Sequence, residues 1–145
     1  MLGTFRKFVG FTVLEYFLTH PTEKTYLKEL AKKLQVSPRS IKIYCDLFDK
    51  EGIINREIRG NVHLFSLNND VFIVREMKRT YMCLFIRSVG IEDVAETPTS
   101  LAIYGTYASG TYDERSDIDL LVLGEEKDVK RDRITTIMKK IDKEL

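Results

Sequence analysis

The chain has 145 residues, of which 43% are hydrophobic and 31% charged, and its net charge is +1. This composition is typical of a folded globular protein and excludes a disordered one. No apolar run approaches the roughly 20 residues of a membrane span, and the first residues lack a signal-peptide pattern, so we expect a cytoplasmic protein without membrane contact. Residues 1–69 hold 11 Lys and Arg against 7 Asp and Glu, a net charge of +4, whereas residues 70–145 hold 12 against 15, a net charge of −3. The two parts are therefore expected to have different partners.

Three helices are predicted in the basic part. Apolar residues at spacings of three and four predict helices over Phe5–Thr19 and Tyr26–Leu34. A third helix is predicted over Pro38–Glu51, because Ser37 is a favourable N-cap and proline is favoured at the first helical position. The outer face of this third helix is polar and basic in its first two turns.

A hairpin is predicted after these helices. Gly52 ends the third helix, and two extended runs, Ile53–Ile58 and Val62–Leu67, are joined by the basic tip Arg59-Gly60-Asn61. Three helices followed by a hairpin resemble the winged helix-turn-helix family over Phe11–Leu67. The resemblance implies that the third helix lies in the major groove of double-stranded DNA and that the hairpin touches its backbone. The DNA-binding residues that it implies are Ser37, Arg39, Ser40, Lys42, Arg56, Arg59 and Asn61.

The alternative for this part is a small helical core with a solvated basic face, or a winged helix used for protein contacts. A charge of about +4 is modest for a DNA-binding domain, so DNA affinity is expected to need a dimer. A long helix is predicted next, over Asp70–Ser88, with Asn68-Asn69-Asp70 as its capping cluster. Its apolar stripe packs either on the first helix or on the same helix of a second subunit. Ile91–Pro98 is expected to be a linker.

The stretch from Ser100 to Leu123 is predicted to hold two strands. Leu101–Tyr104 is an apolar strand that stops at Gly105-Thr106, and Tyr107–Gly110 is expected to form a short helix. A second strand opens with Asp117 and Asp119, whose side chains share one face about 7 Å apart because strand residues alternate. Residues 120–123 are apolar on both faces, which predicts helices on both sides. Carboxylate ligands of this kind favour Mg²⁺ or Mn²⁺ over zinc.

Gly105-Thr106, followed after ten residues by Asp117-Ile118-Asp119, resembles the polymerase-beta-type nucleotidyltransferase superfamily, in particular the minimal nucleotidyltransferase proteins of prokaryotes. The resemblance implies catalytic, metal-binding roles for Asp117 and Asp119. It also implies that a nucleoside triphosphate contacts Gly105, Thr106, Ser109, Gly110 and Ser116.

Three features depart from the family pattern. Thr106 replaces the commoner serine, and Tyr107 and Ser109 stand where arginine is frequent. The family carries a third carboxylate on a later strand, whereas residues 128–144 predict only a helix. The apolar stripe of that helix is expected at Val129, Ile134, Ile137 and Ile141.

The predicted fold class is α+β, with a winged helix-turn-helix domain at residues 1–69, a connecting helix at 70–90 and an incomplete nucleotidyltransferase-like domain at 91–145. Two strands alone do not make a stable sheet. Either a second chain supplies strands, which predicts a homo-oligomer, or the chain is a shortened version of a longer one.

Three functions are open on this sequence. The first is a DNA-binding transcriptional regulator whose second half binds Mg²⁺ and a nucleoside triphosphate. The second is an active metal-dependent nucleotidyltransferase that modifies a hydroxyl of a protein or small molecule; the resemblance alone implies an antitoxin-like role with a toxin as partner. The third is a structural assembly protein that binds no nucleotide.

Overall fold

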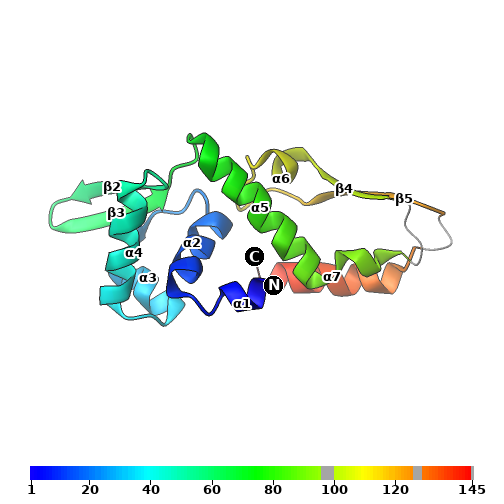
Figure 1. Ribbon diagram of the computed structural model, residues 1–145, viewed down its shortest axis with the longest axis horizontal. Helices are drawn as coiled ribbons and strands as arrows, with labels where there is room; N and C mark the ends of the chain where they lie inside the picture. Colours follow the sequence, from blue (N-terminus) through cyan, green and yellow to red (C-terminus); the bar gives the residue numbers. More distant parts are fainter. Residues whose placement is uncertain (96–99, 126–128, 145) are drawn as a thin grey trace.

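The computed structural model describes residues 1–95, 100–125 and 129–144. Figure 1 shows an elongated molecule with the β2–β3 hairpin at one end, the β4–β5 strands at the other and the long helix α5 running between them. The architecture is α+β, as predicted from the sequence. In chain order the elements are α1 (Leu2–Phe5), α2 (Val9–Thr19), β1 (Thr25–Tyr26), α3 (Leu27–Leu34), α4 (Pro38–Lys50), β2 (Ile54–Arg59), β3 (Val62–Leu67), α5 (Phe72–Val89), the 3-10 helix η1 (Ile91–Val94), β4 (Ser100–Tyr104), α6 (Gly105–Ser109), β5 (Asp119–Leu123) and α7 (Arg131–Glu144).

Helices α3 and α4 and the hairpin lie within one or two residues of their predicted bounds. The Ser37 hydroxyl accepts a hydrogen bond from the Ser40 amide at 3.1 Å, and Pro38 is the first residue of α4, so the predicted cap is confirmed. Gly52 follows the helix with a φ of +71°. Gly60, with a φ of +59°, opens the two-residue loop of the hairpin, a conformation that favours glycine.

One prediction in this part was wrong, and one strand was missed. The helix predicted over Phe5–Thr19 is broken at Arg6–Phe8, where the chain turns and Arg6 pairs with Glu15 at 2.8 Å. Strand β1 was not predicted, because two residues are too short to show a period. It exists because β3 has a free edge, and the antiparallel sheet has the order β1-β3-β2.

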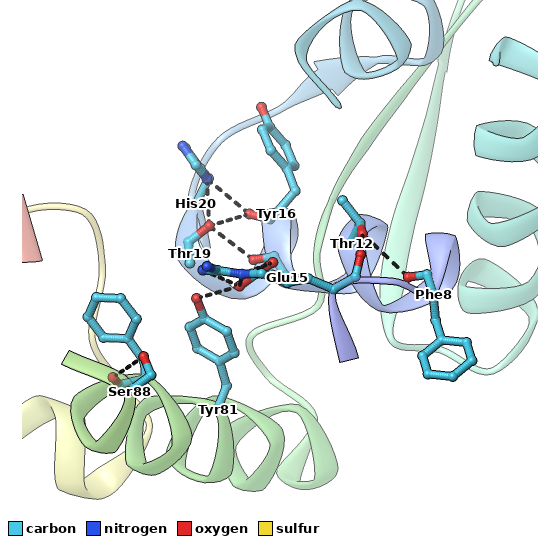
Figure 2. A network of polar contacts seen from close by, with 10 residues as sticks. Phe8, Thr12, Glu15, Tyr16, Thr19, His20, Tyr81 and Ser88 are labelled. Carbon is cyan, nitrogen blue, oxygen red and sulfur yellow. Dashed lines mark hydrogen bonds and ion pairs between the residues drawn. The ribbon is translucent and has the colours of Figure 1, made fainter. Parts of the chain in front are cut away.

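Helix α5 buries its apolar stripe inside the chain. Val74, Tyr81 and Phe85 are at most 3% exposed and belong to one continuous core with α2. Figure 2 shows Tyr81 of α5 reaching Glu15 of α2, to which its hydroxyl donates a hydrogen bond of 3.0 Å. Packing inside the chain, on α1 and α2 as in the first of the two alternatives and also on α6, η1 and α7, therefore buries this stripe.

The N-terminus of α5 differs from its predicted form. Val71 is the N-cap, and the asparagines expected to cap the helix bind elsewhere. The side-chain amide of Asn68 donates to the Gly52 carbonyl at 3.0 Å, and the side-chain amide of Asn69 donates to the Pro21 carbonyl at 2.6 Å. The cluster therefore closes the end of the sheet and leaves the helix uncapped by a side chain.

Strands β4 and β5 form an antiparallel pair that is covered on one face only. Leu101, Ile103 and Val122 pack against the core. Leu121 and Leu123 on the other face are 49% and 51% exposed. The prediction that helices cover both faces was wrong, because within the described residues α5, α6 and α7 all lie on the same side.

The start of β5 and the start of the last helix also differ from prediction. Strand β5 opens at Asp119 and not at Asp117, because its first partner is Tyr104, where β4 ends and the chain turns into α6. Val129 precedes α7 and forms a bridge with Ala95, so it is not part of the helical stripe. Ile134, Ile137 and Ile141 do face the core. Asp128 and Pro98, which bound a predicted helix and linker, lie outside the described residues.

Within residues 1–95, 100–125 and 129–144, none of the helices combines the length and the hydrophobicity that crossing a membrane requires.

Candidate functional site

The carboxylate of Asp119 lies directly against Gly105. A Cβ atom placed on Gly105 would stand 2.4 Å from Asp119 Oδ2, so only glycine leaves room for the carboxylate there. The φ of Gly105 is +71°, which also favours glycine. Register produces this contact, since Asp119 pairs across the strands with Tyr104, the residue before Gly105. The exposed Thr106 follows at the same bend.

Asp117 stands in the loop before β5 and is exposed. Among the described residues, the carboxylates of Asp117 and Asp119 accept no hydrogen bond and form no ion pair. Burial, together with the negative charges of Asp113 and Asp117, raises the pKa of the Tyr107 hydroxyl, which donates to the Ser116 carbonyl at 3.3 Å. The loop therefore places negative charge around α6, which Arg115 and Lys78 offset at Asp113.

The loop that carries these acids is fixed to the N-terminal elements. The Glu114 carboxylate accepts hydrogen bonds from the amide and hydroxyl of Thr22 at 2.8 and 2.6 Å. The Tyr112 hydroxyl donates to the Leu18 carbonyl at 3.0 Å. Tyr112 and Tyr107 stack with their ring centroids 4.3 Å apart. The position of Asp117 is thus set by contacts to residues about 90 positions away.

Lys78 of α5 binds the same loop through the Tyr112 carbonyl. Its side chain is buried, its ammonium donates to the Tyr112 carbonyl at 2.5 Å and to Asn69 Oδ1 at 3.2 Å, and it stands over the Tyr112 ring. Burial lowers the pKa of Lys78 to about 8, although the nearby carboxylates of Glu114 and Asp113 act in the opposite direction. Lys78 therefore joins Asn69 after the β2–β3 hairpin, α5 and the acidic loop, residues 110–118 between α6 and β5.

This burial makes stability depend on pH. The unfolded chain holds the Lys78 proton up to about pH 10.4, whereas the folded chain releases it near pH 8, so the unfolded state binds more protons in between. We expect the free energy of unfolding to rise from pH 8 towards pH 10 and this rise to be absent in K78M. Urea denaturation at several pH values measures it, with K50M at the exposed end of α4 as control. An equal rise in K78M would contradict the assignment.

The remaining residues predicted to bind the nucleotide have structural contacts. The Ser109 hydroxyl donates to the Thr106 carbonyl at 3.1 Å. Gly110 packs against the backbone of α5, and the Ser116 hydroxyl exchanges hydrogen bonds with Asp113 at 2.9 and 3.1 Å. The structure thus brings Gly105, Thr106 and Asp119 together. Ser109, Gly110 and Ser116 instead shape the segment that leads from this bend to Asp117.

The two acids fit a hard divalent cation. The Asp119 carboxylate at this bend and the Asp117 carboxylate in the loop two residues before it have no hydrogen-bond or ion-pair partner among the described residues, and carboxylate oxygens are ligands that Mg²⁺ or Mn²⁺ takes. Within the described parts of the chain, no three His, Cys, Asp or Glu side chains gather as a metal site. Because Mg²⁺ is usually bound by one or two carboxylates plus phosphate and water, the pair is sufficient for a metal that arrives with a phosphate ligand.

A cavity of about 670 Å³ lies on the covered side of the strands, between the β4–β5 pair, η1 and α7. Its walls are mainly apolar, and the acidic loop with Asp113, Glu114 and Asp117 lines one side. Asp119 is not among its lining residues, and it shares the open face of the sheet with Leu121 and Leu123. The cavity and the Gly105–Asp119 contact are therefore distinct surfaces.

The residues predicted to contact DNA lie on α4 and the hairpin. A groove of about 560 Å³ between them is lined in part by Lys42, Arg56 and Asn61. Arg39 is exposed at the start of α4 and has no ion-pair partner among the described residues. Ser37 and Ser40 form the helix cap.

Three of the predicted basic contacts are already paired with acids. Lys42 pairs with Asp46 in the next turn, and Arg59 pairs with Glu57 at 2.6 Å. Arg56 is held by Asp46, lies 3.1 Å from Asp49 and stacks over the Phe65 ring. These pairs reduce the positive charge that the groove presents.

Sequence reasoning missed three groups of functional interest. Lys28 and Tyr26 line the groove beside α4, but Lys28 lies on a helix read only for its apolar stripe. Tyr104 was treated only as the end of an apolar strand, although its place next to the glycine was a usable signal. The bond between Thr22 and Glu114 joins distant segments and leaves no local pattern.

Comparison with known proteins places a family on one part of the chain. No curated protein matches the chain. A solved structure described as a possible transcriptional regulator from Methanosarcina mazei Go1 is similar over 63% of this chain and 81% of its own, with 13% identity and a TM-score of 0.44. The family model of the nucleotidyltransferase domain matches residues 90–145, the part of the chain that includes α6, β5 and both acids.

Proposed function

We propose that the nucleotidyltransferase domain binds a nucleoside triphosphate together with Mg²⁺ (or Mn²⁺), with Asp117 and Asp119 as metal ligands and Gly105-Thr106 as the phosphate seat. The observation that carries this proposal is the contact of Asp119 with Gly105, where a Cβ would stand 2.4 Å from the carboxylate. This contact brings a carboxylate to the same bend as exposed backbone and a threonine hydroxyl, which supports the proposal.

The electrostatics favour a metal–phosphate complex over a free anion. The unpaired carboxylates repel a bare triphosphate, whereas a divalent cation between them and the phosphates removes this repulsion. Bound Mg²⁺ would neutralise negative charge on the phosphates. The Thr106 hydroxyl and the backbone amides that follow Gly105 would donate hydrogen bonds to the phosphate oxygens.

Calorimetric titration of the chain with ATP tests this function. The proposal expects saturable binding in the presence of Mg²⁺ and much weaker binding in EDTA. Binding that is equally tight without a divalent cation, or no binding with it, would refute the proposal.

The family match also favours a reaction at this site, as a second candidate function. In nucleotidyl transfer, the oxygen of an acceptor hydroxyl bonds to the α-phosphorus, the bond to the pyrophosphate oxygen breaks, and the hydroxyl proton is released to a base or to water. In this reaction Asp117 and Asp119 would hold the metal, and the hydroxyl proton passes to water. Release of pyrophosphate that is lost in D117N supports transfer, whereas binding without release leaves the domain a nucleotide sensor.

We further propose that the N-terminal elements form a winged helix-turn-helix that binds double-stranded DNA, so that the whole chain is a regulator of transcription. The order of helices and strands, the net charge of +4 over residues 1–69 and the groove between α4 and the hairpin support this role. The pairing of Lys42, Arg56 and Arg59 with acids leaves few free cations for phosphate contacts, which predicts a weak interaction with a shallow salt dependence.

Replacing Arg39 by alanine tests the DNA proposal most sharply. Since Arg39 is exposed at the start of α4 without an acidic partner among the described residues, R39A is expected to weaken duplex binding about fivefold or more, as loss of about 1 kcal/mol does. Fluorescence anisotropy with a labelled duplex at low salt measures it. R87A removes an exposed arginine from the last turn of α5, far from α4 and the hairpin, and should leave the affinity unchanged. Equal binding by R39A would contradict the proposed docking.

A further inference from the structure

The open face of the β4–β5 sheet carries an aromatic ring beside the Asp119 carboxylate. Along both strands alternate side chains point to the core, and the others form an exposed face. Tyr104 and Leu121 on this open face are 55% and 49% exposed. The two strands therefore present an apolar surface to solvent on the side where Asp119 also emerges.

Strand register places the ring next to the acid. Tyr104 and Asp119 are direct partners in the antiparallel pair, and the side chains of such partners leave the same face with Cβ atoms about 4.5–5.5 Å apart. Asp119 also touches Gly105, which follows Tyr104. One short segment thus contributes the proposed phosphate seat and the ring beside it.

The ring of Tyr104 has no aromatic partner within the described residues, unlike its neighbours in sequence. Tyr107 and Tyr112 are buried and stacked on each other. No hydrogen bond of the Tyr104 hydroxyl occurs in the described parts of the chain. Nothing in the described fold requires an exposed aromatic residue at this position, whereas a ligand with a flat ring would be stabilised by it.

We propose that Tyr104 and Leu121 form the platform on which the nucleoside of the bound triphosphate rests, with the Tyr104 ring stacking on the base. This inference rests on the proposed nucleotide binding. Same-face residues of a strand are about 7 Å apart, so the platform begins next to the metal ligands and extends one nucleoside length along β5. Stacking on an aromatic ring contributes about 1–3 kcal/mol per base and discriminates little between bases.

The platform also predicts the nucleotide selectivity. It offers an aromatic face and aliphatic carbons but only one hydroxyl, so it does not read the hydrogen-bonding edge of a base. ATP, GTP and CTP should therefore bind with affinities of the same order. The occupant that competes with this proposal is a second copy of the chain, which would bury the same face in a dimer.

Titrations with two ligands separate the platform from the phosphate site. ATP and inorganic tripolyphosphate, each with Mg²⁺, are titrated into wild type, Y104A and Y104F, with F72A, 71% exposed at the start of α5, as a matched control. Y104A is expected to bind ATP about tenfold more weakly and tripolyphosphate as tightly as wild type does. Y104F retains the ring and should keep most of the ATP affinity, and F72A should match wild type for both ligands.

Each other outcome overturns the inference in a distinguishable way. If Y104A binds both ligands as wild type does, or loses both equally, Tyr104 is not a platform for the base, while the phosphate site stands. If wild type binds neither ligand, the proposed function fails and the platform with it. If light scattering shows a wild-type dimer that Y104A converts to a monomer without a selective loss of ATP, the face is an interface between copies.

Discussion

Replacing Gly110 by alanine is expected to lower the free energy of unfolding by about 2–6 kcal/mol. A Cβ at this position would stand 2.3 Å from the Arg75 carbonyl oxygen, a backbone atom of α5 that does not move without distorting the helix. The φ of Gly110 is +72°, which adds backbone strain of about 1–3 kcal/mol for a residue with a side chain. Overpacking of this kind typically costs a further 1–3 kcal/mol, roughly.

Gly60→Ala is the matched control for this change. Gly60 also has a positive φ, +59°, but a Cβ there meets nothing within 4 Å. Its replacement should cost only the backbone strain, about 1 kcal/mol. Urea denaturation of wild type, G60A and G110A measures both values. If the two variants are equally stable, Gly110 does not pack against α5 as described, and this contact does not hold the acidic loop on the helix.

Replacing Asp119 by asparagine is expected to weaken Mg²⁺-dependent ATP binding by at least tenfold, or about 1.4 kcal/mol. The amide keeps the size of the side chain, so its place against Gly105 is retained, but it removes the charge that binds the cation. In EDTA the same variant should bind ATP at least as well as wild type, because a carboxylate that repels the phosphates is gone.

This reversal distinguishes metal ligation from simple damage to the fold. A disrupted site would lose affinity both with and without Mg²⁺. D132N, which removes an exposed acid in the first turn of α7, serves as control and should behave as wild type in both titrations. An unchanged Mg²⁺-dependent affinity in D119N would remove Asp119 from the metal site.

Local signals in the sequence were enough to predict helices α3 and α4 and the hairpin of the N-terminal part. Ser37-Pro38 at the start of α4, Gly52 at its end and Gly60 in the hairpin loop each act through the conformation of one or two residues. Such signals do not depend on the rest of the fold. The prediction of these elements was therefore confirmed almost to the residue.

Features that depend on distant partners were not predictable in the same way. Asp117 was expected to open a strand because it lies two residues before Asp119, but the strand begins only where Tyr104 supplies a partner. Strand β1 forms because β3 has an edge to pair with. The anchoring of the acidic loop by Thr22 joins residues 92 positions apart. Register and long-range contacts therefore set the geometry of the candidate site, while the motif supplies only its chemistry.

The exposed strand face has the same origin. A run of four apolar residues predicts a strand buried on both sides, but burial of the second face requires an element that covers it. Among the described residues no element does so, and Leu121 and Leu123 remain half exposed. The homo-oligomer predicted from the two-stranded sheet stays a prediction, which light scattering measures alongside the Tyr104 variants.

The central claim is that a divalent cation and a triphosphate meet at the Gly105–Asp119 contact. Mn²⁺ tests it most directly, because the paramagnetic ion broadens the amide resonances of nearby residues in a ¹⁵N-labelled sample of this chain. With ATP present, substoichiometric Mn²⁺ is expected to broaden Gly105, Thr106 and Asp119 first and to leave Ile43 of α4 sharp. Broadening centred elsewhere, or none at these residues, would contradict the account.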